Sequence, residues 1–181
     1  EIAAAESLAS VETEIDQEVF IASGDIKACF YQCEIDEELS EWFCLPSVSG
    51  DEARVIGVST YEDGTPLPAG TAAVNLSMAV LPMGFSWAFW FVQRLHLEIL
   101  KRADIPTERI ALSHWPFPSQ QEGPVEVPYC DNVTVLGADK VAVTRARGSV
   151  ILAFRAASFG MRGISASEPR ATPVGTMAGR T

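Results

Sequence analysis

One short apolar stretch, residues 18–24, ends directly before an aspartate and constrains how the rest of the chain can fold. Its sequence, Glu-Val-Phe-Ile-Ala-Ser-Gly, has the β-branched and aromatic content of a buried strand and stops at a glycine. Asp25 therefore stands at a strand end, where a carboxylate is well placed to hold a cation. In most proteins an aspartate in such a position only forms a turn.

A second pair of apolar runs, residues 125–130 and 133–136, flanks Asp131 and Asn132. Both of these residue types tolerate positive φ, so we expect a tight hairpin with the two residues at its tip. Asp25 and Asp131 are 106 positions apart in sequence. Neighbouring strands of one sheet could nevertheless bring their carboxylates together.

The helices of the chain are indicated by periodicity and by start and stop signals. A helix is expected from Ser86, as N-cap, to Arg102, with an inner face that recurs every three or four residues. That face comprises Phe85, Phe89, Val92, His96 and Ile99. A second helix is expected over residues 140–158, ended by Phe159-Gly160.

The remaining segments are expected to be strands and connections. Short strands are predicted over 42–45 and 72–81, with a loop or hairpin insertion over 47–70 in which 54–60 is the only strand-like island. A long irregular connection is predicted over 105–128, and a solvated helix or loose lead-in over 1–17. The order is strand, strand, strand, helix, hairpin, helix. This order predicts an α+β fold, with helices on one face of an antiparallel sheet.

Composition bounds the class of protein. The 181 residues, 48% of them apolar, suffice for a single domain with a core. No apolar run reaches the roughly 20 residues needed to cross a bilayer. The four cysteines form no CxxC pair, so we expect reduced thiols in an intracellular, cytoplasmic or nuclear protein that is not secreted. Because the chain begins at Glu1 without an initiator Met, we expect it to be a fragment of a longer reading frame.

The net charge of −11 is unevenly distributed. Residues 1–139 carry 23 acidic and 6 basic side chains, whereas residues 140–181 carry 1 and 7. Affinity for nucleic acid comes largely from Lys and Arg that neutralise phosphates, so the acidic body argues against such binding on charge alone.

Three short motifs follow one another in the chain. They are Asp25-Ile26-Lys27-Ala28-Cys29-Phe30-Tyr31, Leu81-Pro82-Met83-Gly84-Phe85 and Tyr129-Cys130-Asp131-Asn132. Together and in this order they resemble the palm of a retroelement reverse transcriptase over about residues 15 to 168. The first is similar to the family's first metal-binding motif, an Asp followed by a short run with an aromatic pair. The second resembles the Leu-Pro-x-Gly motif that opens a helix beneath the templating base, and the third resembles the Tyr-x-Asp-Asp hairpin.

The resemblance implies roles for individual residues. Asp25 and Asp131 would be the catalytic metal ligands, with the Ile26 carbonyl and Asn132 as further ligands. Residues expected near the incoming nucleotide are Phe30, Tyr31, Met83 and Gly84, with Phe30 placed to exclude a 2′-hydroxyl. For Phe30 and Met83 the alternative is ordinary core packing. Gly84 would permit a close backbone approach.

The resemblance also divides the chain and shows where it departs from the family. Its parts are the first metal motif (18–33), fingers-like strands with an insertion (42–81), the helix motif (82–103), the catalytic hairpin (125–137), the following helix and strand (140–168) and a tail (169–181). Asn132 replaces the second Asp of the hairpin, and the Lys that often follows Gly160 in the family is missing. The fingers are expected to be partial and the thumb absent.

The function implied is RNA-directed DNA polymerisation, a nucleotidyl transfer by two Mg²⁺ or Mn²⁺ ions about 4 Å apart. Its partners would be an RNA or DNA template-primer and deoxynucleoside triphosphates, with no membrane. Two alternatives remain open: a catalytically inactive retroelement remnant that serves as a palm-scaffold binding module, and a small nucleotidyl cyclase. The oligomeric state is not indicated by the sequence.

Overall fold

The computed structural model describes residues 11, 17–61, 63–159 and 161–162. The chain divides into two compact units. Residues 1–29 and 86–181 form the sheet unit, and residues 30–85 form the insert unit. The single domain expected from length stays a prediction. The expected lead-in over 1–17 and the tail over 169–181 lie almost entirely outside the described residues.

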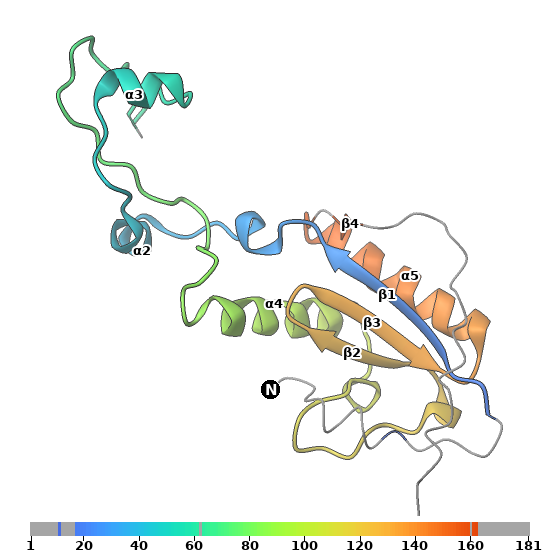
Figure 1. Ribbon diagram of the computed structural model, residues 1–181. Helices are drawn as coiled ribbons and strands as arrows, with labels where there is room; N and C mark the ends of the chain where they lie inside the picture. Colours follow the sequence, from blue (N-terminus) through green and yellow to red (C-terminus); the bar gives the residue numbers. More distant parts are fainter. Residues whose placement is uncertain (1–10, 12–16, 62, 160, 163–181) are drawn as a thin grey trace, which may run out of the picture. The chain divides into compact units, whose positions relative to one another are not determined.

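The sheet unit contains a four-stranded sheet in which every neighbouring pair is antiparallel (Figure 1). Its order is β2-β3-β1-β4, with β1 Phe20–Ile26, β2 Val125–Tyr129, β3 Asn132–Gly137 and β4 Met161–Arg162. The predicted strand over 18–24 is confirmed with a shift of two residues, which places Asp25 inside β1. The α+β class is likewise confirmed.

Two helices, α4 (Ala88–Arg102) and α5 (Lys140–Ala156), lie on the same side of the strands in Figure 1. Val143 of α5 packs against Ala22 of β1 and Val135 of β3. The Asp139 side chain caps α5 by accepting hydrogen bonds from the backbone N–H groups of Val141 and Ala142. Helix α4 begins after Trp87 and has no side-chain cap, so the prediction of Ser86 as its N-cap was wrong.

The opposite face of the sheet is partly covered by the connection between α4 and β2. Val125, Val127 and Leu136 form a core there with Ala111, and Phe117 packs against it. This connection contains only the short 3₁₀ turns η3 (Thr107–Arg109) and η4 (Gln120–Glu122), so the predicted irregular segment is confirmed.

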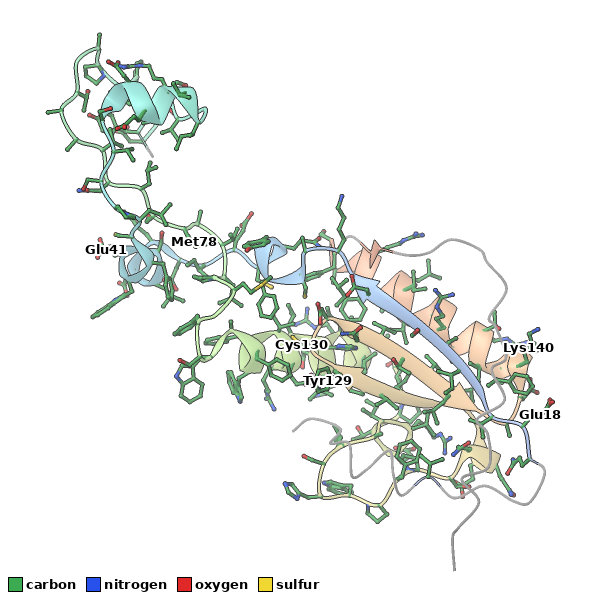
Figure 2. The ribbon with its side chains drawn as sticks, in the orientation of Figure 1. Glu18, Glu41, Met78, Tyr129, Cys130 and Lys140 are labelled. Carbon is green, nitrogen blue, oxygen red and sulfur yellow. The ribbon has the colours of Figure 1, made fainter. Side chains whose placement is uncertain are left out.

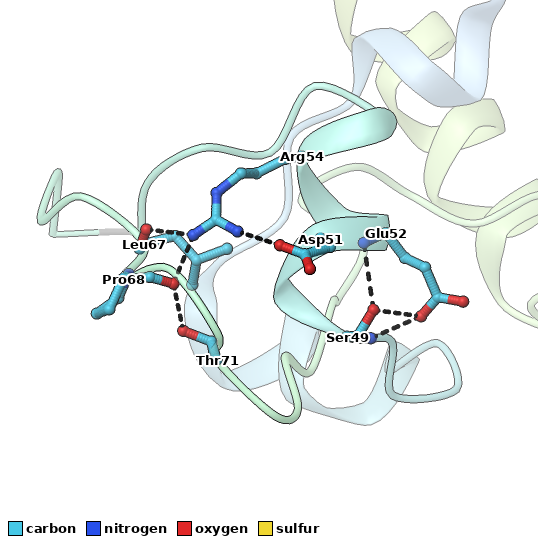
Figure 3. Close-up of polar contacts among 7 residues, drawn as sticks. All are labelled: Ser49, Asp51, Glu52, Arg54, Leu67, Pro68 and Thr71. Carbon is cyan, nitrogen blue, oxygen red and sulfur yellow. Dashed lines mark hydrogen bonds and ion pairs between the residues drawn. The ribbon is translucent and has the colours of Figure 1, made fainter.

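The insert unit is built around α3 (Gly50–Val55), a helix that was not predicted from the sequence (Figure 3). Ser49 and Glu52 form a reciprocal capping box at its start. Arg54 donates from its guanidinium to the carbonyl oxygens of Leu67 and Pro68 and so ties the helix to the following loop.

The other elements of this unit are α2 (Glu37–Ser40) and the 3₁₀ turns η1 (Cys29–Gln32, which begins at the unit boundary) and η2 (Glu41–Phe43). The predicted strand over 42–45, the strand-like island over 54–60 and the predicted strand over 72–81 are not strands in the structure. The first and third make only isolated bridges, such as Cys44 with Ser77 and Val48 with Val74. Most of segment 54–60 is the end of α3 and the turn after it. The capping box of Ser49 and Glu52 starts a helix directly before this segment.

Glu126, in the middle of β2, is a buried acid in the sheet unit. Burial raises the pKa of its carboxyl group to about 8. The unfolded chain releases this proton near pH 4.5, whereas the folded chain keeps it until about pH 8. The contribution of Glu126 to stability is therefore fully present below pH 4.5 and is lost as the pH rises toward 8.

We expect Glu126→Gln, which resembles the protonated acid, to raise the free energy of unfolding at pH 8 by on the order of 2 kcal/mol. The gain should shrink toward zero at pH 4.5, and urea denaturation at both pH values measures it. Glu108→Gln, at an exposed position, is the control and should leave the pH dependence unchanged. If both substitutions change the pH dependence of the unfolding free energy equally, burial does not raise the pKa of Glu126 as stated.

Candidate metal site at the ends of β1 and β3

The register between β1 and β3 brings the two predicted acidic ligands to the same end of the sheet. The pairing runs from Phe20 opposite Gly137 to Asp25 opposite Asn132. One position further on, the Ile26 N–H donates a hydrogen bond to the carbonyl oxygen of Asp131, with an N to O distance of 2.9 Å. Ile26 and Asp131, which are 105 positions apart in sequence, thus become direct backbone neighbours.

The face from which each side chain projects follows from strand alternation. Ala22 packs against α5, so Ile26, four positions later, projects to the same helical face, where it is buried. Asp25 projects from the opposite face. Asn132, directly across from it, lies on that face too, because paired residues of an antiparallel ladder share a face.

Asp131 is hydrogen-bonded to Asn132, which lies on the same face of the sheet as Asp25. The Nδ2 group of Asn132 donates a hydrogen bond to Oδ1 of Asp131 at 3.1 Å. The two residues of the family-like motif are therefore in contact, and Asn132 supplies a neutral amide where a second acid would add a charge. Its remaining oxygen is of the type that hard divalent ions accept as a ligand.

The tip of the hairpin differs from the expectation by one residue. Tyr129 pairs with Asn132, so Cys130 and Asp131 form the two-residue turn and Asn132 is already the first residue of β3. Of the two turn residues, Cys130 has the positive φ, 52°. This is the arrangement of a type II′ turn, which favours glycine at its first position. The prediction that Asp131 and Asn132 form the tip was wrong for this reason.

Two side chains of α4 contact the backbone of this turn (Figure 2 labels Tyr129 and Cys130). Gln93 accepts a hydrogen bond from the Cys130 N–H at 2.6 Å and donates one to the Pro128 carbonyl at 3.1 Å. Nδ1 of His96 lies 2.9 Å from the Cys130 carbonyl oxygen and must carry the proton, because a carbonyl only accepts. Both side chains are buried.

His96 was predicted on the inner face of the helix, whereas Gln93 was not predicted as a functional residue. The available signal was a polar residue beside Val92 on a face expected to be apolar, since buried polar groups are nearly always hydrogen-bonded.

Burial lowers the pKa of His96 to about 4, and the hydrogen bond to Cys130 and the charge of Asp131 offset part of that effect. The imidazole is therefore neutral at pH 7. Since the unfolded chain takes up this proton near pH 6.5, the contribution of His96 to stability is lost as the pH falls from 6.5 toward 4.

We expect His96→Asn, which does not titrate, to reduce the loss of unfolding free energy between pH 6.5 and pH 4 by on the order of 2 kcal/mol. Denaturant titrations at the two pH values measure this loss. Val92→Ala, on the same helix, should lower stability equally at both. If the two variants show the same pH dependence, His96 is not the group responsible.

The other predicted site residues have defined local environments. Tyr129 is half exposed, and its ring contacts that of Phe89 edge-to-face at 5.4 Å. Within the insert unit, Tyr31 and Met83 are exposed and Phe30 is half-buried. Gly84 has φ of 101°, and a Cβ there would meet nothing within 4 Å, so the backbone conformation alone favours glycine. The nucleotide-binding roles of these four residues stay predictions.

The four residues predicted to hold metal ions lie next to one another at these strand ends. The oxygen ligands that they could offer a hard divalent cation are the carboxylates of Asp25 and Asp131, the side-chain oxygen of Asn132 and the backbone carbonyl of Ile26. Water and a triphosphate can complete the coordination of Mg²⁺ around so few protein ligands. Within the described ranges, no cluster of three or more His, Cys, Asp or Glu side chains is placed to hold a metal ion.

Comparison with protein-family models found no match, and comparison with curated proteins found none either. In the part of the chain that the structure describes, no helix is both long and apolar enough to cross a membrane.

Proposed function

We propose that the sheet unit is the palm of a reverse transcriptase, an RNA-directed DNA polymerase of the retroelement type, within a longer protein. The observation that supports this most strongly is the pairing of Asp25 with Asn132, together with the bond from Ile26 to Asp131. It joins the first and third motifs of the resemblance at one sheet end. A four-stranded antiparallel sheet with two helices on one face agrees with a palm.

Nucleotidyl transfer depends on positioning and on stabilisation of charge. Two divalent ions, when bound, would activate a primer 3′-hydroxyl and stabilise the leaving pyrophosphate. Asp25 and Asp131 would hold them from adjacent strands, and the Asn132 amide would orient the Asp131 carboxylate through its hydrogen bond. The substrates would be a template-primer and deoxynucleoside triphosphates.

A second candidate function is suggested by Asn132. With Asn132 in place of a second Asp in the hairpin, the site has two acidic side chains. The Asn132 amide also donates a hydrogen bond to Oδ1 of Asp131. A palm scaffold that binds ions or partners weakly without catalysis is the function that this substitution favours. Primer extension separates the two candidates, because only the polymerase incorporates nucleotides.

Asp25→Asn and Asp131→Asn should each abolish specific Mn²⁺ binding, because each removes one of two charged ligands. Paramagnetic broadening of the amide signals of β1 and β3 in the 181-residue chain measures this binding. Asp104→Asn, an exposed acid after the far end of α4, is the matched control and should bind Mn²⁺ normally. Broadening that survives in both site variants would contradict the assignment.

Asn132→Asp should strengthen Mn²⁺ binding, by roughly tenfold, because it adds a charged oxygen ligand beside Asp131. The same titration measures the affinity. In a longer protein that extends primers, this substitution should also raise the extension rate if the palm is active. An unchanged affinity would show that Asn132 does not face the ion.

A further inference from the structure

The turn that carries Asp131 is held in a conformation that its own sequence does not favour. Cys130 has φ of 52°, where a residue with a Cβ is less stable than glycine by about 1 kcal/mol. Such a conformation persists only when surrounding structure determines it. The surrounding structure here is the inner face of α4.

Gln93 and His96 together fix both peptide planes that flank Cys130. In the peptide plane before Cys130, the Cys130 N–H donates a hydrogen bond to the Gln93 side chain. In the plane after it, Nδ1 of His96 donates one to the Cys130 carbonyl oxygen. Because peptide units are planar, these two bonds restrain the orientation of both planes and so limit φ and ψ of Cys130. The second plane also carries the backbone nitrogen of Asp131, so the same bonds set where the Asp131 side chain begins.

The two side chains are matched to this task. They are three positions apart, so they lie on the same side of α4. Both are almost fully buried, at 2% and 1% exposure, where a polar group without a partner is strongly disfavoured. His96 is further fixed by an edge-to-face contact with Phe154 of α5, with ring centroids 4.8 Å apart. A shift of the turn would therefore break several buried hydrogen bonds at once.

We propose that Gln93 and His96 are positioning residues that orient Asp131 for metal binding, acting through the backbone of Cys130. This inference rests on the proposed function, since it assigns Asp131 as a ligand. Groups that hold a metal ligand without touching the ion commonly account for 10- to 100-fold in affinity. The pair would tune the site from the helix without adding any charge to it.

The test compares Mn²⁺ affinity of the 181-residue chain with that of Gln93→Leu and His96→Leu, measured by electron paramagnetic resonance of the free ion. Each variant should bind Mn²⁺ roughly tenfold more weakly. His96→Asn, whose amide can again donate to the Cys130 carbonyl, should restore affinity to within about twofold of the original. Val92→Ala is the control, because it removes buried volume from the same helix without a polar contact to the turn.

Two readouts separate positioning from simple destabilisation. Val92→Ala should lower the unfolding free energy yet leave Mn²⁺ affinity unchanged, whereas Gln93→Leu should also speed hydrogen exchange at the Cys130 amide in the absence of metal. Equal affinities for the Leu variants and the original chain, or an equal loss in Val92→Ala, would overturn the positioning role alone. Failure of the original chain to bind Mn²⁺ would overturn the proposed function and this inference with it.

Discussion

The antiparallel register between β1 and β3 is the constraint on which the site depends. With this register, Ala22 and Ile26 of β1 and Val133 and Val135 of β3 are buried, while Asp25 projects from the other face. A slip of one residue in β1 would exchange the two faces, bury the carboxylate and expose Ile26. The same apolar burial that stabilises the central strands therefore also specifies where the acidic side chain lies.

Helix α4 contributes to both packing and site geometry. Val92 and Ile99 supply buried apolar surface, whereas Gln93 and His96 on the same helix hold the hairpin turn. Polar groups inside a core define geometry more narrowly than apolar packing does, because each must meet its partner at a set distance and angle. The turn is thus built from two distant parts of the chain, and its position depends on the helix as much as on the hairpin sequence.

Elements with a clear apolar periodicity of their own were predicted from the sequence. The hairpin strands and the helix over 140–158 were recoverable from apolar periodicity, and the nearness of the Asp25 and Asp131 backbones was expected from the order of the motifs. The segment 72–81 was not, since its apolar alternation finds only isolated bridges in place of a partner strand. α3 was missed although Ser49 and Glu52 carried the capping signal. The one-residue shift of the turn follows from tertiary bonds to Gln93 and His96, which no local pattern around Cys130 contains.

The proposed metal site is tested most directly by a crystal structure of the 181-residue chain grown with Mn²⁺ and measured at the manganese absorption edge. We predict anomalous difference peaks at the ends of β1 and β3, with oxygen atoms of both Asp25 and Asp131 at about 2.0–2.3 Å from the metal. Side chains of these two aspartates that point to opposite faces of the sheet, or metal peaks that contact neither carboxylate, would contradict this prediction.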